Sequence, residues 1–239
     1  MLWTQDLQNS IFSSPEVVDD SVYIASYDQN VYAIHASSGA VQWRFSTSGQ
    51  IVSSPTVANG ILYIGSYDQN VYALNAITGT AAWSPFATGG PIDAAPAVTN
   101  GIVYIGSQDG TLYLLNATSG KLVGHYTTGG AIFSSAAVAN GRVYFGSADG
   151  NVYALDAVTG NPAWRAPART GGPIKSSPTV ANGIVYIGSG DHMVYALHAM
   201  TGAILWSFPT GGVIRSSPTI VNGVLSVGSE DGNLYLFHL

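Results

Sequence analysis

Apolar and polar residues alternate with a period of two in short runs along the whole chain, and turn residues separate the runs. The segments GILYIGS and NVYALNA are typical, since they are rich in the Val, Ile, Leu and Tyr that suit a half-buried pleated surface. Asn-Gly pairs stand between such runs at Asn59, Asn100, Asn140, Asn182 and Asn222, and Asp19-Asp20 takes their place near the N-terminus. Because both residues of Asn-Gly tolerate positive φ, these pairs predict tight β-hairpins.

The same pattern is written six times, about every forty residues. The copies begin at Ile11, Ile51, Ile92, Ile132, Ile174 and Ile214. The first five copies contain three turns: Asn-Gly or its equivalent, a turn with one Asp, and a Thr-Gly or Ser-Gly turn; the sixth copy contains the first two. Three turns separate four strands, and a repeated four-stranded antiparallel unit is a propeller blade. The sequence therefore predicts an all-β fold, a six-bladed β-propeller of four-stranded antiparallel blades.

The sixth copy stops at Leu239, before the Trp-bearing segment that ends the other copies. Trp3 precedes Ile11 by eight residues, just as Trp43 precedes Ile51. We therefore expect residues 1–10 to complete the last blade, with residues 2–7 as its outer strand. The ring would then be closed by the N-terminal strand, and residues 1–239 would form a single monomeric domain.

One position of the fourth strand carries a large aromatic ring in five of the six copies. These residues are Trp3, Trp43, Trp83, Trp164 and Trp206, and Gly124 stands there in the third copy. A ring repeated in this way is interpreted as structural packing between blades, since a buried aromatic removes about 150–250 Å² from water. The third blade is accordingly expected to pack least well.

The segment from Ala73 to Trp83, ALNAITGTAAW, resembles the A-x-D-x-x-T-G-x-x-x-W signature of PQQ-like, quinoprotein-type β-propeller repeats, and Ala154 to Trp164 matches it fully. His35, Asn75, Asn116, His198 and His238 replace the signature Asp elsewhere. The resemblance covers the whole sequence. The family includes quinoprotein dehydrogenases, the lipoprotein subunit of the outer-membrane barrel assembly machine and sensor domains of kinases, so its members differ in function. It implies an extracytoplasmic location.

Composition narrows the choice of partners. Seven basic residues against 13 acidic ones give a net charge of −6, and no basic stripe is present, so nucleic acid is not expected as a partner. No apolar run reaches the ~18–20 residues of a membrane helix. The N-terminus lacks the basic flank and apolar core of a signal peptide. The absence of Cys excludes disulfides and thiolate chemistry.

We predict that the protein is not an enzyme. The resemblance implies, for quinoprotein dehydrogenases, a calcium ion beside the quinone, and calcium needs about six to eight converging oxygen ligands. Six of the acids here are instead the repeated turn residues Asp28, Asp68, Asp109, Asp149, Asp191 and Asp231. A turn Asp usually binds its own backbone. PQQ with calcium is therefore not expected, and no cofactor or metal is predicted.

Two positions differ sharply in chemistry between copies. The mouth position, which follows the first Ile of each copy, holds Phe12, Val52, Asp93, Phe133, Lys175 and Arg215. The pre-turn position, before the turn Asp, holds Tyr27, Tyr67, Gln108, Ala148, Gly190 and Glu230. Both are predicted to lie at one mouth of the central channel, with Arg169 from the lengthened fourth copy. The candidate ligand-binding residues are Tyr27, Tyr67, Asp93, Arg169, Lys175, Arg215 and Glu230; the alternative is neutral drift on a solvated rim.

The function predicted from the sequence is a non-catalytic binding or scaffolding propeller for a protein, a peptide or a small anionic ligand. One alternative is a PQQ-dependent oxidoreductase or a degenerate relative. Another is an amplified or designed repeat protein with no evolved ligand, since SYDQNVYA occurs twice. The fifth copy has Asp191-His192-Met193 in place of a turn with Gly or with Asn30 or Asn70, so either the turn changes type or it tolerates strain.

Overall fold

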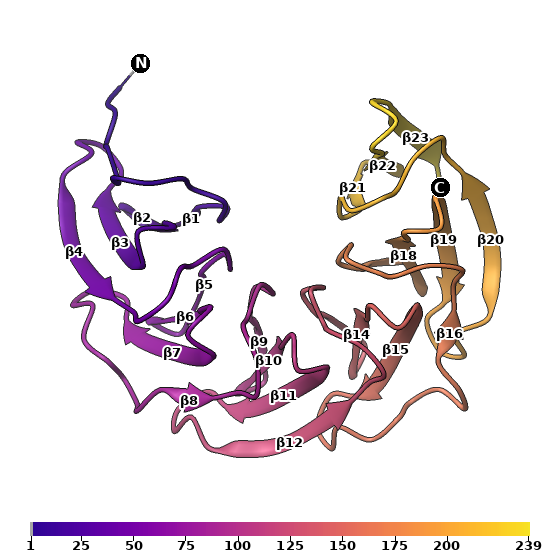
Figure 1. The fold of residues 1–239 in the computed structure, drawn as a ribbon, viewed down its shortest axis with the longest axis horizontal. Coiled ribbons are helices and arrows are strands. Elements are labelled where there is room, and N and C mark those ends of the chain that lie inside the picture. Colours follow the sequence, from indigo (N-terminus) through magenta and orange to yellow (C-terminus); the bar gives the residue numbers. More distant parts are fainter. Residues whose placement is uncertain (1) are drawn as a thin grey trace. The chain divides into compact units, whose positions relative to one another are not determined.

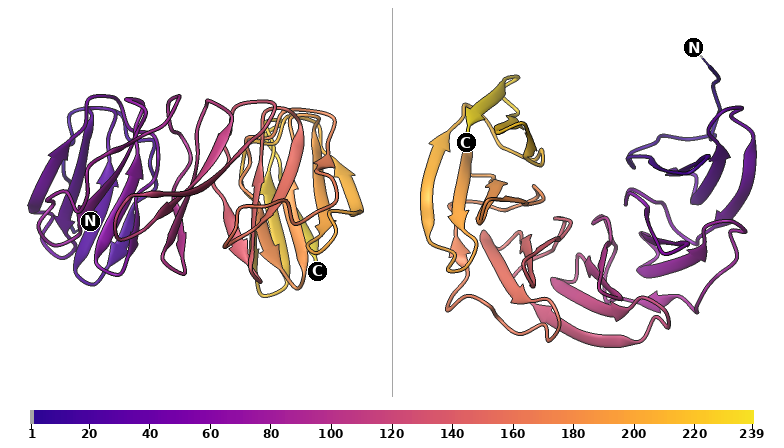
Figure 2. Two further views of the ribbon diagram at one scale, coloured as in Figure 1. Left: turned by 90° about the horizontal axis from the view of Figure 1, so that it is seen from below. Right: turned by 180° about the vertical axis from the view of Figure 1, so that it is seen from behind.

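The computed structural model describes residues 2–239, and this part of the protein consists of strands and turns. Its strands form six antiparallel sheets, one for each sequence repeat (Figure 1). Seen from the side, the strands of each sheet run back and forth between turns at the two ends (Figure 2). No helix in the described residues is long and apolar enough to cross a membrane. The predicted all-β class and the six antiparallel blades are confirmed.

Each sheet takes its strands in sequence order. The first contains β1 (Glu16–Val18), β2 (Ser21–Ala25), β3 (Asn30–His35) and β4 (Val41–Ser46). The second contains β5 (Thr56–Ala58), β6 (Ile61–Gly65), β7 (Asn70–Asn75) and β8 (Phe86–Ala87). The third contains β9 (Ala97–Thr99), β10 (Ile102–Gly106), β11 (Thr111–Asn116) and β12 (Leu122–Thr127). The fourth contains β13 (Ala137–Ala139), β14 (Arg142–Gly146), β15 (Asn151–Asp156) and β16 (Ala168–Arg169). The fifth contains β17 (Thr179–Ala181), β18 (Ile184–Gly188), β19 (Met193–His198) and β20 (Ile204–Pro209), and the sixth contains β21 (Thr219–Val221), β22 (Val224–Gly228) and β23 (Leu234–His238).

The protein divides into two compact units. The first unit ends at Asp109 and also takes Tyr113–Val123, while the second takes Gly110–Leu112 and Gly124–Leu239. The first and second sheets therefore belong to the first unit, and the fourth, fifth and sixth sheets belong to the second. The division runs through the third sheet.

The Asn-Gly hairpins have the predicted geometry. Asn59 and Gly60 both have positive φ, 51° and 76°, and they join β5 to β6 in the register Ala58 with Ile61. The turn before the third strand departs from our expectation, however. Asn30 and Asn70 were expected to supply its positive φ, but that conformation is taken by Gln29 (74°) and Gln69 (71°), and the Asn residues begin β3 and β7.

The fifth sheet keeps the same turn without Gly. His192 has a φ of 73°, and the backbone bonds from Ser189 N to Met193 O and from His192 N to Ser189 O repeat those of the first sheet. Of the two interpretations of this turn, a changed turn type is therefore wrong. Three of the six turns hold a non-Gly residue in the left-handed region, which costs roughly 1–2 kcal/mol for a residue other than Gly.

The core lies between successive sheets of each unit. In the first unit, Tyr63 and Val71 of the second sheet pack with Ile92, Val103 and Ile105 of the third. The first Ile of the second to sixth repeats is fully buried. A Cβ on Gly65 would lie 2.1 Å from Cγ2 of Ile92, and a Cβ on Gly188 would lie 2.1 Å from Cγ2 of Ile214. Gly at this strand position therefore lets the next repeat approach closely.

The sixth sheet has three strands among the described residues, and residues 2–10 form no strand. Trp3 nevertheless lies on the first sheet, where its Nε1 donates to the carbonyl oxygen of Ala36 at 2.7 Å. The closing of the last blade by the N-terminal segment stays a prediction.

Candidate functional site

The turn Asp residues bind backbone amides and a tyrosine. Asp149 accepts bonds from Asn151 N at 2.9 Å, from Gly129 N at 2.8 Å and from the Tyr153 hydroxyl at 2.6 Å. The Tyr always comes four residues later, on the third strand of the same sheet. The six pairs are Asp28–Tyr32, Asp68–Tyr72, Asp109–Tyr113, Asp149–Tyr153, Asp191–Tyr195 and Asp231–Tyr235.

In the fourth sheet, these bonds shift the pKa values of both Asp149 and Tyr153. Burial alone would raise the pKa of Asp149, but the bonds from Tyr153, Gly129, Asn151 and Ser147 outweigh it, and the pKa lies below its ordinary value. Burial, and then the bond to Asp149, raise the pKa of the Tyr153 hydroxyl. A carboxylate held ionised by donors and a hydroxyl held protonated are poor general acids and bases near neutral pH.

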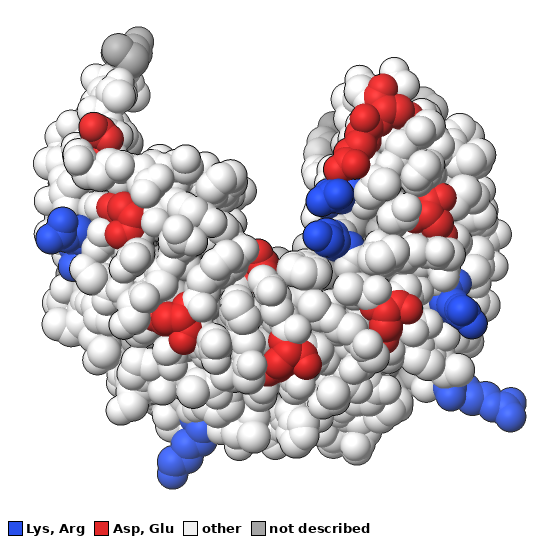
Figure 3. Space-filling view, in the orientation of Figure 1, with Lys and Arg blue, Asp and Glu red and all other residues white. Residues whose placement is uncertain are grey.

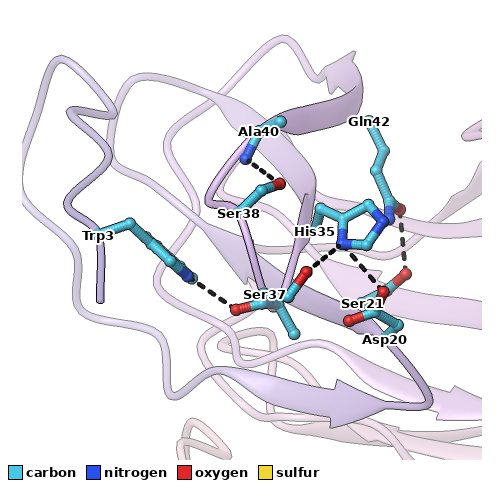
Figure 4. Close-up of polar contacts among 9 residues, drawn as sticks. Trp3, Asp20, Ser21, His35, Ser37, Ser38, Ala40 and Gln42 are labelled. Atoms are coloured by element: carbon cyan, nitrogen blue, oxygen red, sulfur yellow. Dashed lines mark hydrogen bonds and ion pairs between the residues drawn. The ribbon is translucent and has the colours of Figure 1, made fainter.

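The signature position also serves its own turn. Asp156 Oδ1 accepts bonds from the backbone N–H of Val158 at 3.0 Å and of Thr159 at 2.8 Å, and Asn75 does the same for the turn that follows it. His35 instead pairs its Nδ1 with Asp20 Oδ2 at 3.0 Å and with Ser37 Oγ at 3.3 Å (Figure 4). No group of three His, Asp or Glu residues among those described could hold a metal ion.

The predicted fourth-strand position is confirmed for Trp43 in β4 and Trp206 in β20 but is wrong for Trp83 and Trp164, which precede the short strands β8 and β16; Trp3 lies in a segment that forms no strand. The indoles of Trp3, Trp43, Trp83 and Trp164 dock beside the Ser-Gly or Thr-Gly turn of the repeat that follows each of them. The Trp43 Nε1 donates to the carbonyl oxygen of Ala76 at 2.8 Å, and a Cβ on Gly79 would lie 2.6 Å from the Trp43 ring. Trp3, Trp83 and Trp164 donate in the same way to Ala36, Ala117 and Ala199. The ring of Trp206 lies 5.4 Å from that of Phe237. The carbonyl and the Gly face thus form a repeated socket for the indole.

In the first unit, the mouth residues Asp93 and Phe12 contact side chains at the pre-turn position. Asp93 accepts a bond from the Tyr67 hydroxyl at 2.6 Å through Oδ1 and one from Gln108 Nε2 at 2.5 Å through Oδ2. Tyr67 comes from the preceding repeat, and Gln108 comes from the same repeat as Asp93. Phe12 has an aromatic partner of the same kind, since its ring meets that of Tyr27 edge-on at 5.3 Å.

In the second unit, the mouth position is basic. Arg215 Nε pairs with Glu230 Oε1 at 2.7 Å, and both side chains are about half exposed. Figure 3 shows basic (blue) and acidic (red) side chains next to each other at the upper right, over the fifth and sixth sheets. The exposed Lys175 places its ammonium 4.5 Å from the centre of the Phe133 ring, a cation–π contact.

A pocket of about 180 Å³ opens beside these two cations. Its lining consists of Pro173, Lys175, Gly190, Val213, Ile214 and Arg215. Arg169 is not in this pocket. It lies exposed on β16, opposite Asn151, and lines a neighbouring pocket with Asp149 and Gly172; Pro173 contributes to both pockets.

The candidate residues therefore fall into two sets. Tyr27, Tyr67 and Asp93 belong to the first unit, where Tyr67 and Asp93 contact each other. Lys175, Arg215 and Glu230 belong to the second, where Lys175 and Arg215 share a pocket and Glu230 pairs with Arg215. Sequence reasoning did not include Gln108, Pro173 or Gly190 among the site residues. The signal for Gln108 and Gly190 was present in the variable pre-turn position.

Comparisons with known proteins agree with this architecture. A family model described as outer membrane protein assembly factor BamB matches residues 1–126, 86–178 and 149–238. Among solved structures, the computationally designed Ika8 protein superposes with a TM-score of 0.85 at 17% identity, covering 95% of this protein and 70% of that one. BamB from Moraxella catarrhalis superposes with a TM-score of 0.82 at 22% identity, covering 95% of this protein and 72% of that one.

No curated protein matches the sequence. At these identities the two solved structures show the fold, which is a propeller, while the family model covers nearly the whole sequence. The resemblance inferred from the repeat signature is confirmed. The protein belongs to the PQQ-repeat β-propeller family described as outer membrane protein assembly factor BamB.

Proposed function

We propose that this propeller is a non-catalytic binding module that holds a protein or peptide partner. One observation carries the proposal: the turn Asp residues, which could act as bases, make the same structural hydrogen bond in every repeat. All six turn Asp residues accept a Tyr hydroxyl. A base repeated once per blade serves the blade and not a single reaction centre.

The acids do not fit a calcium-bound quinone. Asp93 is held by Tyr67 and Gln108, Glu16 accepts the backbone N–H of Val57, and Asp156 is held by its own turn. Calcium requires about six to eight oxygens around one point, and these carboxylates point to separate partners. We derive no reaction step through such a cofactor.

The family supports a role in assembly. Its description names an outer-membrane protein assembly factor, and the solved BamB structure has the same fold. A rigid β scaffold with variable residues at corresponding positions of each repeat is suited to holding a partner. We propose an extracytoplasmic location on the same ground.

The test has two arms. In the first, the purified protein is titrated with PQQ and calcium, while Trp fluorescence and dye-linked alcohol oxidation are followed; we expect neither saturable binding nor turnover. In the second, fluorescent peptides of acidic, basic and apolar composition are titrated and their anisotropy is measured; we expect saturable binding of at least one class. Turnover with PQQ, or no binding of any peptide, would contradict the proposal.

A further inference from the structure

The pre-turn side chains supply partners to the mouth position in several of the repeats. Asp93 is held from both sides, by Tyr67 of the preceding repeat and by Gln108 of its own. Arg215 is held by Glu230 of its own repeat, and Phe12 meets Tyr27 of its own repeat. In these three repeats, therefore, the mouth residue contacts one or both of the neighbouring pre-turn side chains, whereas Phe133 meets Lys175 instead.

Lys175 lacks both of these partners. The two pre-turn residues on its sides are Ala148 of the preceding repeat and Gly190 of its own, and neither has a polar side chain. The ammonium of Lys175 contacts the Phe133 ring. This contact leaves its N–H groups available to donate hydrogen bonds to an acceptor. Arg215 lacks one partner, because its preceding pre-turn residue is also Gly190, and only its Nε is used by Glu230.

A pocket borders Gly190, the pre-turn residue without a side chain. Gly190 lines it together with Lys175 and Arg215, and Pro173 and Val213 form apolar walls. A Cβ on Gly190 would lie 2.8 Å from the carbonyl oxygen of Pro173, so a larger residue would force the backbone to move. The packing therefore keeps this position free of a side chain while two cations face the pocket that it borders.

We propose that this pocket binds a carboxylate, which takes the place of the acidic or amide side chain that other repeats provide at the pre-turn position. The ammonium of Lys175 and the remaining guanidinium N–H groups of Arg215 are the donors, and Pro173 and Val213 contact the apolar stem that carries the carboxylate. The proposal rests on the proposed binding function and deepens it, since it names an acidic peptide group as the ligand. The carboxylate is supplied by a Glu or Asp residue of the peptide or by its free C-terminus.

Three peptides and one ion distinguish the sources. The first peptide is acetylated and amidated with one central Glu, the second has Gln in its place, and the third has no acid but a free C-terminus; the ion is inorganic phosphate. Each is titrated at low salt into ¹⁵N-labelled protein, and the amide shifts of Lys175, Gly190 and Arg215 are followed. We expect saturable shifts with the Glu peptide, the free C-terminus or both, and none with the Gln peptide. Tighter binding of phosphate than of either carboxylate would overturn the proposal.

Variants test the residues. Lys175→Gln and Arg215→Gln should each weaken binding of the carboxylate at least about fivefold, because each removes a charge-assisted hydrogen bond. Lys121→Gln makes the same charge change at an exposed residue outside the pocket and should leave affinity unchanged. Ala148→Glu places an internal carboxylate at a pre-turn position beside Lys175 and should also weaken binding. Affinity should fall between low salt and physiological salt, where the Debye length is about 8 Å.

The outcomes separate this inference from the proposed function. If basic or apolar peptides bind and the Glu and free-C-terminus peptides do not, the binding function stands and the carboxylate site is wrong. If no peptide binds, both are wrong. Equal loss of affinity in Lys121→Gln and Lys175→Gln would show that only net charge matters, and it too would overturn the site.

Discussion

At the scale of single residues, the socket formed by a carbonyl and a Gly shows how one Trp side chain joins successive sheets. Trp43 combines a hydrogen bond to Ala76 with stacking on Gly79, and Trp164 repeats both contacts with Ala199 and Gly202. Gly124 occupies the Trp position of the third repeat. Its nearest neighbour for an added Cβ is the carbonyl oxygen of Thr159 at 3.7 Å, so the position has room for a larger residue.

We predict that Gly124→Trp stabilises the protein. The variant restores the repeated packing and removes a Gly from a strand, and we expect the free energy of unfolding to rise by about 1–3 kcal/mol. Urea denaturation followed by far-UV circular dichroism measures this change. Gly124→Ala is the matched control and should gain only about 0.5–1 kcal/mol, the strand effect alone. A Trp variant less stable than the Ala variant would show that the socket is closed at this repeat.

At the scale of the elements, the Asp–Tyr pair fastens the turn before the third strand to the loop that enters the sheet. Asp149 accepts the amide of Gly129 from that loop and the hydroxyl of Tyr153 from β15. Since its pKa is lower in the folded protein than in the unfolded state, its contribution to stability is complete above the ordinary Asp pKa of about 3.9. The contribution is lost as the pH falls through the lower folded value.

Tyr153→Phe should therefore destabilise the protein in a pH-dependent way. The expected loss is about 1 kcal/mol at pH 7, because a partly exposed carboxylate loses one donor, and it should shrink as Asp149 becomes protonated in acid. Tyr63→Phe is the control, because the Tyr63 hydroxyl donates to the carbonyl oxygen of Ala117, which does not titrate. Urea denaturation of both variants between about pH 7 and pH 2 measures the difference, because the folded pKa of Asp149 lies below its ordinary value. A loss in Tyr153→Phe that does not change with pH would contradict the ion-dependent bond.

The elements also show how far the sequence alone carries. Local rules predict the hairpins, the meander order and the role of Asp149 in its turn. They suffice because Asn-Gly pairs and the Asp side chain determine the backbone conformation within a few residues. The pairing of Tyr67 with Asp93 joins residues from two repeats, and no local pattern specifies which hydroxyl meets which carboxylate. The sequence predicted positive φ for Asn30, because Asn tolerates that conformation better than Gln. In the structure Gln29 adopts it instead, and the backbone N–H of Asn30 donates to Asp28 Oδ1.

The candidate site was predicted only in part. Comparing repeats identified Lys175, Arg215 and Glu230, since sharp chemical differences stand out against a constant blade. The separate position of Arg169 on β16 could not be read from the sequence, because the length of the loop before it hides where the fourth strand resumes. The close approach of Pro173 explains why position 190 is Gly, and only the structure shows this contact.

At the scale of the whole molecule, the first and last sheets each present a face that the interior sheets bury. Ile11 is 49% exposed, whereas its counterpart Ile51 is fully buried. Leu234 and Leu236 of β23 are 66% and 62% exposed, while the corresponding Val194 and Ala196 of β19 are fully buried. Each face matches one half of the packing between interior sheets. An uncovered apolar face and an open strand edge promote association, so both faces are expected to be covered in solution.

We predict that residues 2–7 cover the edge of β23 as the fourth strand of the sixth sheet. In the first sheet Val31 lies opposite Phe45, and in the fifth Val194 lies opposite Phe208; by the same register Leu234 should lie opposite Gln5. Because the protein has no Cys, Gln5→Cys with Leu234→Cys should form a disulfide on mild oxidation, as residues opposed in a strand pair have suitable Cα spacing. The control pair, Gln5→Cys with Tyr235→Cys, points to opposite faces and should remain reduced.

The products distinguish which molecule supplies the strand. Non-reducing electrophoresis and light scattering should show a cross-linked monomer if the protein closes on itself. A disulfide-linked dimer would mean that a second copy supplies the N-terminal strand, which contradicts closure within one molecule while keeping the register. Equal cross-linking in both Cys pairs would indicate random collision, and no cross-link in either would leave the edge of β23 without this partner. If the cross-linked product is a monomer, deleting residues 1–10 should lower the melting temperature further than Trp3→Ala does, or cause oligomerisation. If it is not, the deletion should have only the effect of Trp3→Ala, because Trp3 binds Ala36 with or without a closed ring.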